Sequence, residues 1–122
     1  MILIDTSSWI NHFRQRDMEV VEALRQERAV TCDVVLAELT LGAGIPEAVR
    51  TSLFRLPRVV EPTMGEVLAF IVAERRRLGL GVGVADVVVL RAAMGAGARH
   101  LTADTRLRET WRRWYATAGD PT

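Results

Sequence analysis

Four acidic residues in this sequence stand among apolar neighbours, where an ionised carboxylate would be poorly hydrated. Asp5 follows the run Met-Ile-Leu-Ile, and Glu38 is the acid of Val-Val-Leu-Ala-Glu-Leu. Asp86 lies between Val-Ala and Val-Val-Val, and Asp104 follows His-Leu-Thr-Ala. A buried carboxylate is costly unless it is paired with a cation or bound to a metal ion. These acids are therefore the first candidates for chemistry.

Such carboxylates would favour a divalent cation. Clustered carboxylates repel one another, so some would take up protons when no cation is present. Arginine could neutralise one or two of them, but four aimed at one point are better neutralised by Mg²⁺ or Mn²⁺, which prefer hard oxygen ligands. A cation of this kind polarises a phosphodiester and activates water. The residue types therefore predict a metal site for phosphodiester hydrolysis, with candidate ligands Asp5, Glu38, Asp86 and Asp104.

A simpler explanation exists for three of the acids, because aspartate caps helices. Asp5 would cap a helix that begins near Ser7, and Asp104 one that begins near Thr105; Asp86 would cap a third. Glu38 has no capping role, because it lies in the middle of a predicted helix. The joint occurrence of the four favours a site.

Other catalytic sites find little support. His12, His100 and Cys32 lack the spacing of a zinc site, and no Gly-x-Ser-x-Gly motif occurs. The glycine-rich segment 79–83 has neither a Walker lysine nor the Rossmann spacing, and it predicts a loop. All 16 basic residues are arginine, so the lysine that phosphoaspartyl domains use is absent. The chain offers one cysteine, which excludes an internal disulfide and fits a reducing compartment.

Apolar patterns and caps predict alternating strands and helices. Strands are expected at 1–4, 29–32, 58–61 and 99–102. Helices are expected at 17–28, at 34–43, from Pro46 onward and after the capping box at 63–66. Asp33 is the expected N-cap of the helix at 34–43. Segment 84–93 has strand propensity in its valines and helix propensity in its alanines, so both assignments stay open. This alternation predicts an α/β sandwich around a mostly parallel sheet, with ligands beyond the carboxyl ends of the strands. Asp5 and Asp104 stand there.

The bulk properties are those of one globular domain. The 122 residues suit a single domain spanning 1–122, and about half of them are apolar. The N-terminus has no basic region of the kind that precedes an export signal, and no apolar run is long enough to cross a bilayer. We therefore expect a cytoplasmic protein with no membrane partner.

The acidic motifs resemble those of PIN-domain nucleases, especially VapC-type toxins of bacterial toxin–antitoxin pairs. Met-Ile-Leu-Ile-Asp5-Thr-Ser-Ser-Trp-Ile resembles the opening motif, and Val-Leu-Ala-Glu38-Leu the second. Val-Ala-Asp86-Val-Val-Val-Leu-Arg-Ala-Ala resembles the third, and His-Leu-Thr-Ala-Asp104-Thr-Arg-Leu the fourth. They occur in the family's order and span nearly the whole chain. At the C-terminus the family usually adds a short helix and a last strand, for which 115–118 is only a weak candidate.

The resemblance implies an α/β/α sandwich, endoribonuclease activity dependent on Mg²⁺ or Mn²⁺, homodimerisation and inhibition by a cognate antitoxin. Asp5 and Asp86 would be the principal metal ligands, with Glu38 and Asp104 completing the acidic pocket directly or through water. Thr6 and Thr102 would hold carboxylates or the attacking water; segment 84–93 would be a helix with Asp86 near its start. The alternatives are a catalytically silent PIN-like module that binds RNA or protein, and a DNA nuclease, for which this short chain offers no insertions to grip a branched duplex.

Several surface features are candidates for binding. Arginine suits bidentate pairing with phosphate, so candidate RNA contacts are Arg75, Arg76, Arg77, Arg106, Arg108, Arg112 and Arg113, of which Arg106 and Arg108 follow Asp104 closely. Three tryptophans could stack bases, but buried packing is the simpler expectation for Trp9, Trp111 and Trp114. The apolar faces of 34–41 and 49–54 are candidates to receive an antitoxin helix.

Overall fold

The computed structural model describes residues 1–42, 44–79 and 81–118, and it leaves the side chains of 113 and 115–118 outside the description. In chain order its elements are β1 (Ile2–Ile4), α1 (Thr6–Arg14), α2 (Met18–Arg25), β2 (Ala29–Val30), α3 (Asp33–Gly42), α4 (Glu47–Phe54), α5 (Met64–Leu78), α6 (Val84–Ala96), β3 (Arg99–Leu101) and α7 (Thr105–Ala118). Among the described residues, no helix combines the length and apolar character needed to cross a membrane.

The strands form one parallel sheet in the order β2-β1-β3. Ile2 pairs with Ala29 on one side and with Arg99 on the other, while Leu3 pairs with His100. Because all three strands run the same way, their carboxyl ends meet at one edge of the sheet. Asp5 follows β1 directly, and its backbone N–H donates to the Leu101 carbonyl oxygen at 3.0 Å, which fixes it beside the end of β3.

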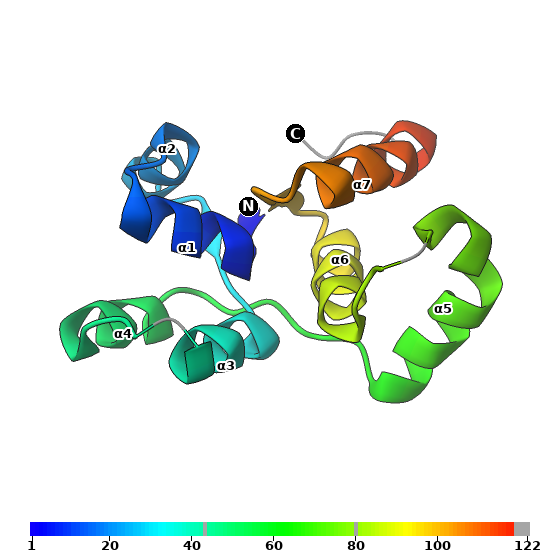
Figure 1. Cartoon of the computed structure of the whole chain (residues 1–122), viewed down its shortest axis with the longest axis horizontal. Helices are drawn as coiled ribbons and strands as arrows, with labels where there is room; N and C mark the ends of the chain where they lie inside the picture. Colours follow the sequence, from blue (N-terminus) through cyan, green and yellow to red (C-terminus); the bar gives the residue numbers. More distant parts are fainter. Residues whose placement is uncertain (43, 80, 119–122) are drawn as a thin grey trace.

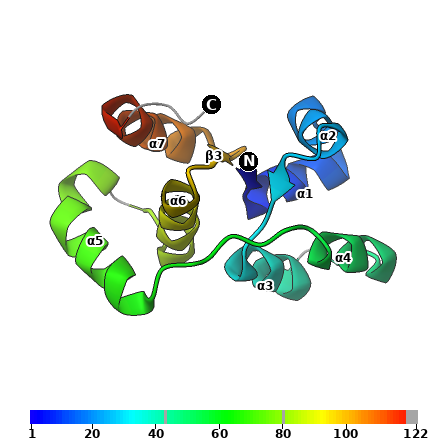
Figure 2. The same ribbon diagram turned by 180° about the vertical axis from the view of Figure 1, so that it is seen from behind.

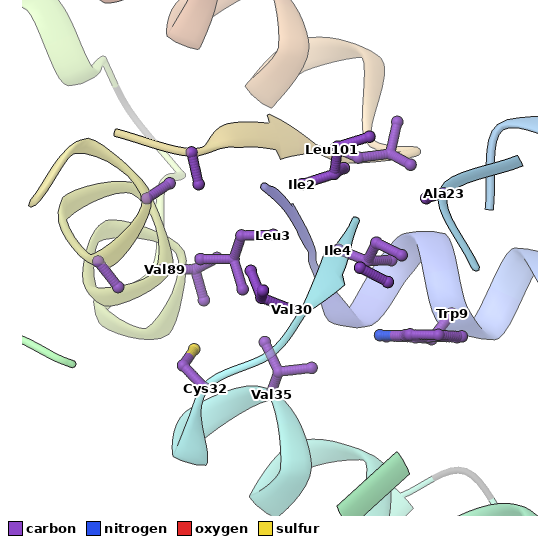
Figure 3. Packing of buried hydrophobic residues seen from close by; sticks show 14 of the residues in the cluster. Ile2, Leu3, Ile4, Trp9, Ala23, Val30, Cys32, Val35, Val89 and Leu101 are labelled. Carbon is purple, nitrogen blue, oxygen red and sulfur yellow. The ribbon is translucent and has the colours of Figure 1, made fainter. Parts of the chain in front are cut away.

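Helices cover both faces of the sheet, so the architecture is an α/β/α sandwich. Figures 1 and 2 show α1 and α2 on one side of the strands and α5, α6 and α7 on the other. Successive side chains of a strand point to opposite faces. Accordingly, Figure 3 shows Leu3 pointing toward Val89 of α6, whereas Ile2 and Ile4 point toward the side of Trp9.

Helix α6 is buried on most of its surface because it lies between two apolar clusters. Val89, Ala92 and Ala93 pack in the cluster around the sheet. Val87, Val88 and Leu90 pack in a second cluster with α5 and α7. Gly97 ends the helix in the left-handed conformation with φ 64°. Segment 84–93 is therefore helical, as the family resemblance implied.

The three tryptophans are packing residues. Trp9 belongs to the cluster around the sheet, and Trp111 and Trp114 belong to the second cluster; each is at most 5% exposed. Base stacking on these rings would require the clusters to open. The expectation of buried packing is confirmed.

Three predicted local features were wrong. The strand expected at 58–61 is reduced to one isolated bridge between Thr31 and Arg58, because Pro57 and Pro62 confine the segment. The candidate strand at 115–118 is the last part of helix α7. Asp33 is the first residue of α3 rather than its cap, and the Glu61 carboxylate accepts from the Val34 N–H at 2.7 Å in its place. By contrast, the capping box of Thr63 and Glu66 is confirmed.

Candidate active site

Four carboxylates from distant parts of the chain line one cleft at the carboxyl edge of the sheet. Asp5 comes from the end of β1, Glu38 from α3, Asp86 from the first turn of α6, and Asp104 from the residue before α7. The cleft has a volume of about 220 Å³, and its lining combines the four acids with hydroxyl and apolar side chains. The lining residues are Asp5, Thr6, Ser7, Ile10, Glu38, Asp86, Val89, Asp104 and Leu107. The parallel topology therefore brings the four predicted acids to one place.

The capping roles considered for Asp5 and Asp104 are real, whereas Asp86 lies in the first turn of α6 and its side chain bonds back to the N-cap residue Gly83. Asp5 Oδ1 accepts from the Ser8 N–H at 3.2 Å and caps α1. Asp104 Oδ1 accepts from the N–H groups of Arg106 and Leu107 at 2.9 and 3.3 Å. Asp86 Oδ2 accepts from the Gly83 N–H at 3.1 Å. Each cap engages one carboxylate oxygen and leaves the other oxygen of that residue for a ligand, so capping and metal binding are compatible.

The four acidic side chains, all expected to be poorly hydrated, differ in their exposure to solvent. Asp5 is buried, with 6% of its surface exposed. Asp86 and Asp104 are half-buried, whereas Glu38 is exposed, so for Glu38 the expectation was wrong. The reason is that Val35, Leu36 and Leu39 form the core-facing stripe of α3, which leaves Glu38 outside that stripe.

The two predicted threonines contact the acids in different ways. The Thr6 hydroxyl donates to Glu38 Oε1 at 2.7 Å and so ties the start of α1 to α3. Thr102 is buried at the end of β3, and its Oγ1 accepts from the Asp104 N–H at 3.1 Å. Thr102 therefore shapes the turn that presents Asp104.

Ser7 joins the first and fourth motifs and was missed in the sequence. Its hydroxyl donates to Asp5 Oδ1 at 2.6 Å, and its Oγ accepts from the Ala103 N–H at 3.1 Å. The same oxygen lies 3.1 Å from Thr102 Oγ1. The available signal was the position of this serine two residues after Asp5, where a hydroxyl in the first turn reaches the cap.

The pKa values of two acids move in opposite directions. Burial acts to raise the pKa of Asp5, but the adjacent His100 imidazole, with the hydroxyls of Ser7 and Thr102, outweighs it and leaves this pKa below 3.8. Burial raises the pKa of Asp86 above 3.8, and the charges of Asp5 and Asp104 raise it further, although the Gly83 N–H opposes them. The cleft therefore holds Asp5 ionised, whereas the surroundings of Asp86 on balance disfavour its ionised form.

Comparison with known proteins decides the family. Residues 2–112 match the PIN domain. The chain belongs to the PIN-domain family. It is 38% identical over 113 residues to the Ribonuclease VapC32 of Mycobacterium tuberculosis strain CDC 1551 and, equally, to that of strain H37Rv. The match covers 88% of this chain and 88% of each relative, so this PIN domain is of the VapC type.

The donor set of this PIN domain fits a hard divalent cation. Its candidate ligands are carboxylate oxygens, and the raised pKa of Asp86 marks a place where a positive charge would be stabilised. Within the described ranges, no three acidic, histidine or cysteine side chains are yet near enough to hold one ion together. Binding would therefore require the acids to draw together. Cys32 lies in the core and His12 beside Trp9, so neither joins the acids of the cleft.

Because the pKa of Asp86 is raised, the free energy of unfolding of the metal-free protein should depend on pH through this group. The folded PIN domain holds the Asp86 proton more tightly than the unfolded chain, so this group adds stability as the pH falls from above its raised pKa toward 3.8. In chelator, Asp86→Asn is expected to be more stable than wild type at neutral pH, with a difference that shrinks over this range. Urea unfolding of both proteins against pH measures it; a difference independent of pH would contradict the assignment.

One predicted arginine lies beside the acids. Arg106 lines a second cleft of about 180 Å³ together with Asp86 and Asp104, and its guanidinium lies over Gly81. Arg108 donates to the Thr102 carbonyl oxygen at 2.7 Å, and Arg77 stacks on Trp114 at 4.4 Å, so both have structural partners. Arg75, Arg76 and Arg112 are exposed and line neither of these two clefts, and the Arg113 side chain lies outside the description.

Proposed function

We propose that this PIN domain, as one domain spanning 1–122, is a cytoplasmic endoribonuclease that hydrolyses RNA phosphodiester bonds with Mg²⁺ or Mn²⁺. We further propose that it is the toxin of a toxin–antitoxin pair and forms a homodimer. The observation that carries the proposal is the convergence of four carboxylates from distant segments on one cleft. The similarity to relatives named Ribonuclease VapC32 supports RNA as the substrate.

In this proposal each acid has a role in metal binding that follows from its surroundings. Asp5, buried and ionised, and Asp86, whose pKa is raised by burial and by the neighbouring acids, are the principal ligands. Glu38 and Asp104 complete the pocket directly or through water. A bound cation would supply polarisation of the phosphodiester and activation of water. Thr6 holds the Glu38 carboxylate, and Thr102 holds the turn that carries Asp104.

The test is cleavage of total cellular RNA by the inhibitor-free protein with Mg²⁺, with Mn²⁺ and with chelator, alongside Asp5→Ala. We expect discrete products that depend on the metal and disappear with chelator or in the variant. A folded wild-type protein that cleaves nothing under any condition would overturn the proposal in favour of a PIN-like module that only binds RNA or protein. Light scattering of the same sample tests the homodimer.

Arg106 is expected to contact an RNA phosphate. It is the cationic side chain of the cleft next to the acids, so its guanidinium can pair with the negative charge of an RNA phosphate there. In an inactive Asp86→Asn background, Arg106→Ala should weaken RNA binding and lower the slope of log affinity against log salt by about 0.7, the value for one contact to a single strand. Arg16→Ala, which removes an exposed arginine between α1 and α2, is the matched control. An unchanged slope would remove Arg106 from the footprint.

The antitoxin is proposed to bind the apolar groove between α3 and α4. This groove has a volume of about 370 Å³ and is lined mainly by Leu36, Ala37, Thr40, Leu41 and Phe54, with Asp33 and Arg58 at its edge. Leu41 is 89% exposed, which is unfavourable for an unpartnered apolar side chain.

We also propose that an antitoxin arginine enters the acidic cleft and competes with the metal. Raising Mg²⁺ should then reduce inhibition by the cognate antitoxin in an RNA-cleavage assay. Inhibition that is the same at all Mg²⁺ concentrations would contradict this competition.

A further inference from the structure

A buried imidazole stands directly behind the acidic cleft. His100 lies in the middle of β3, and its side chain is 1% exposed. Its Nε2 is 3.5 Å from Asp5 Oδ2, and the Asp5 side chain is itself only 8% exposed. On the other side, the ring of Trp111 from α7 lies 6.0 Å from the imidazole, centroid to centroid. His100 therefore separates Asp5 from the second apolar cluster.

Apolar packing alone does not explain a histidine at this position. Both ring nitrogens are buried, and neither has a short hydrogen-bond partner among the described residues. A buried polar nitrogen without a partner costs free energy, whereas an apolar side chain would fill the same space without that cost. The nearest acceptor is Asp5 Oδ2, at the long limit of a hydrogen bond. Hydrogen bonds of ligand-free sites are commonly long and shorten when the site is loaded.

The sheet register places His100 where it can act on Asp5. His100 pairs with Leu3, so its side chain lies on the same face of the sheet as Leu3. Asp5 is two residues after Leu3, and its N–H is bonded to the Leu101 carbonyl oxygen. The first carboxylate oxygen of Asp5 is held by Ser7 and the Ser8 N–H. His100 faces the second, Oδ2, so the two oxygens are approached by donors from different elements.

We propose that His100 is a positioning residue that donates its Nε2–H to Asp5 Oδ2 and fixes the carboxylate plane for metal binding. Each carboxylate oxygen has two lone pairs, and Oδ1 uses both for the Ser7 hydroxyl and the Ser8 N–H. Oδ2 can accept from His100 with one lone pair and face a cation with the other. Hydrogen bonds to ligating carboxylates orient them, and removing such a partner commonly reduces metal affinity or activity 10–100-fold. This inference rests on the proposed function, because it assumes that Asp5 binds the metal.

Two substitutions separate positioning from packing. His100→Phe keeps a ring against Trp111 but removes the donor, and His100→Gln provides an amide N–H near the position of Nε2. Leu101→Val, a change at the next residue on the opposite face of β3, is the control for a loss of packing. The readouts are Mn²⁺ affinity by electron paramagnetic resonance, thermal unfolding in chelator, and kcat and KM for RNA cleavage.

We expect His100→Phe to bind Mn²⁺ about 10–100-fold more weakly and to lower kcat with little change in KM. We expect His100→Gln to recover most of the affinity and Leu101→Val to lose thermal stability without losing affinity. Wild-type affinity in His100→Phe, or equal losses in the Phe and Gln variants, would overturn the proposal.

A measurement on the wild-type protein covers the case in which His100→Phe does not fold. In ¹⁵N NMR of the imidazole, the proposal requires a proton on Nε2 and a change of its signal on Asp5→Asn. A His100 that carries its proton only on Nδ1 would overturn it. If the wild type binds no Mn²⁺, the proposed function fails as well, and the absence of wild-type binding distinguishes that result from a failure of the variants alone.

Discussion

Replacing Asp86 by asparagine is expected to reduce metal-dependent RNA cleavage more than about 100-fold, because even partners one step removed from a metal commonly contribute 10–100-fold. Asparagine keeps a side-chain oxygen that can accept from the Gly83 N–H, so the start of α6 should stay intact. What it removes is the negative charge that Asp5 and Asp104 oppose and that a cation would balance. The measurement is the initial rate of cleavage at saturating Mn²⁺, with thermal unfolding of the same sample.

Asp17→Asn is the matched control for this change. Asp17 also accepts from a backbone N–H at the start of a helix, that of Glu19 at 2.9 Å, but it lies outside the acidic cleft. We expect Asp17→Asn to cleave RNA at the wild-type rate. Wild-type cleavage by Asp86→Asn, or an equal loss in both variants, would contradict the role given to Asp86.

Replacing Ser7 by alanine is expected to reduce cleavage about 10–100-fold and to lower the free energy of unfolding by about 1 kcal/mol. The Ser7 hydroxyl supports Asp5 Oδ1 at 2.6 Å and satisfies the Ala103 N–H at 3.1 Å, so alanine would loosen the first and fourth motifs together. Cleavage rates and urea unfolding of the inhibitor-free protein measure the two effects.

Ser52→Ala serves as the control, since the Ser52 hydroxyl donates to the Ala48 carbonyl oxygen within exposed helix α4. It should leave both quantities near wild type. If Ser7→Ala were as active and as stable as Ser52→Ala, Ser7 would have no part in holding the site.

The sequence predicts the acidic cleft well because its parts have local signals. Asp5 follows a short apolar strand, and in a parallel sheet that position lies at the ligand-binding edge. Asp104 follows β3 in the same way. Glu38 stood out because a glutamate in the middle of a helix caps nothing. Local signals therefore identify each acid separately. The order of the strands is needed only to predict that the acids meet at one edge of the sheet.

Other features depend on tertiary contacts and could not be predicted from local pattern. Segment 84–93 has no clear helical period because α6 is covered on several sides by two clusters, so residues alone left strand and helix open. Glu61 caps α3 from 27 positions away, which no local signal shows. The link from Ser7 to Ala103 spans 96 positions and exists only after β1 and β3 have paired.

The most direct test is the diffraction structure of the inhibitor-free protein soaked in Mn²⁺, with an anomalous difference map. The account predicts an anomalous peak in the cleft, in contact with Asp5 and Asp86 and near Glu38 and Asp104, and no such peak in crystals of Asp86→Asn. A cleft without an anomalous peak in crystals of protein that cleaves RNA with Mn²⁺ in solution would contradict the claim that these four carboxylates form the metal site.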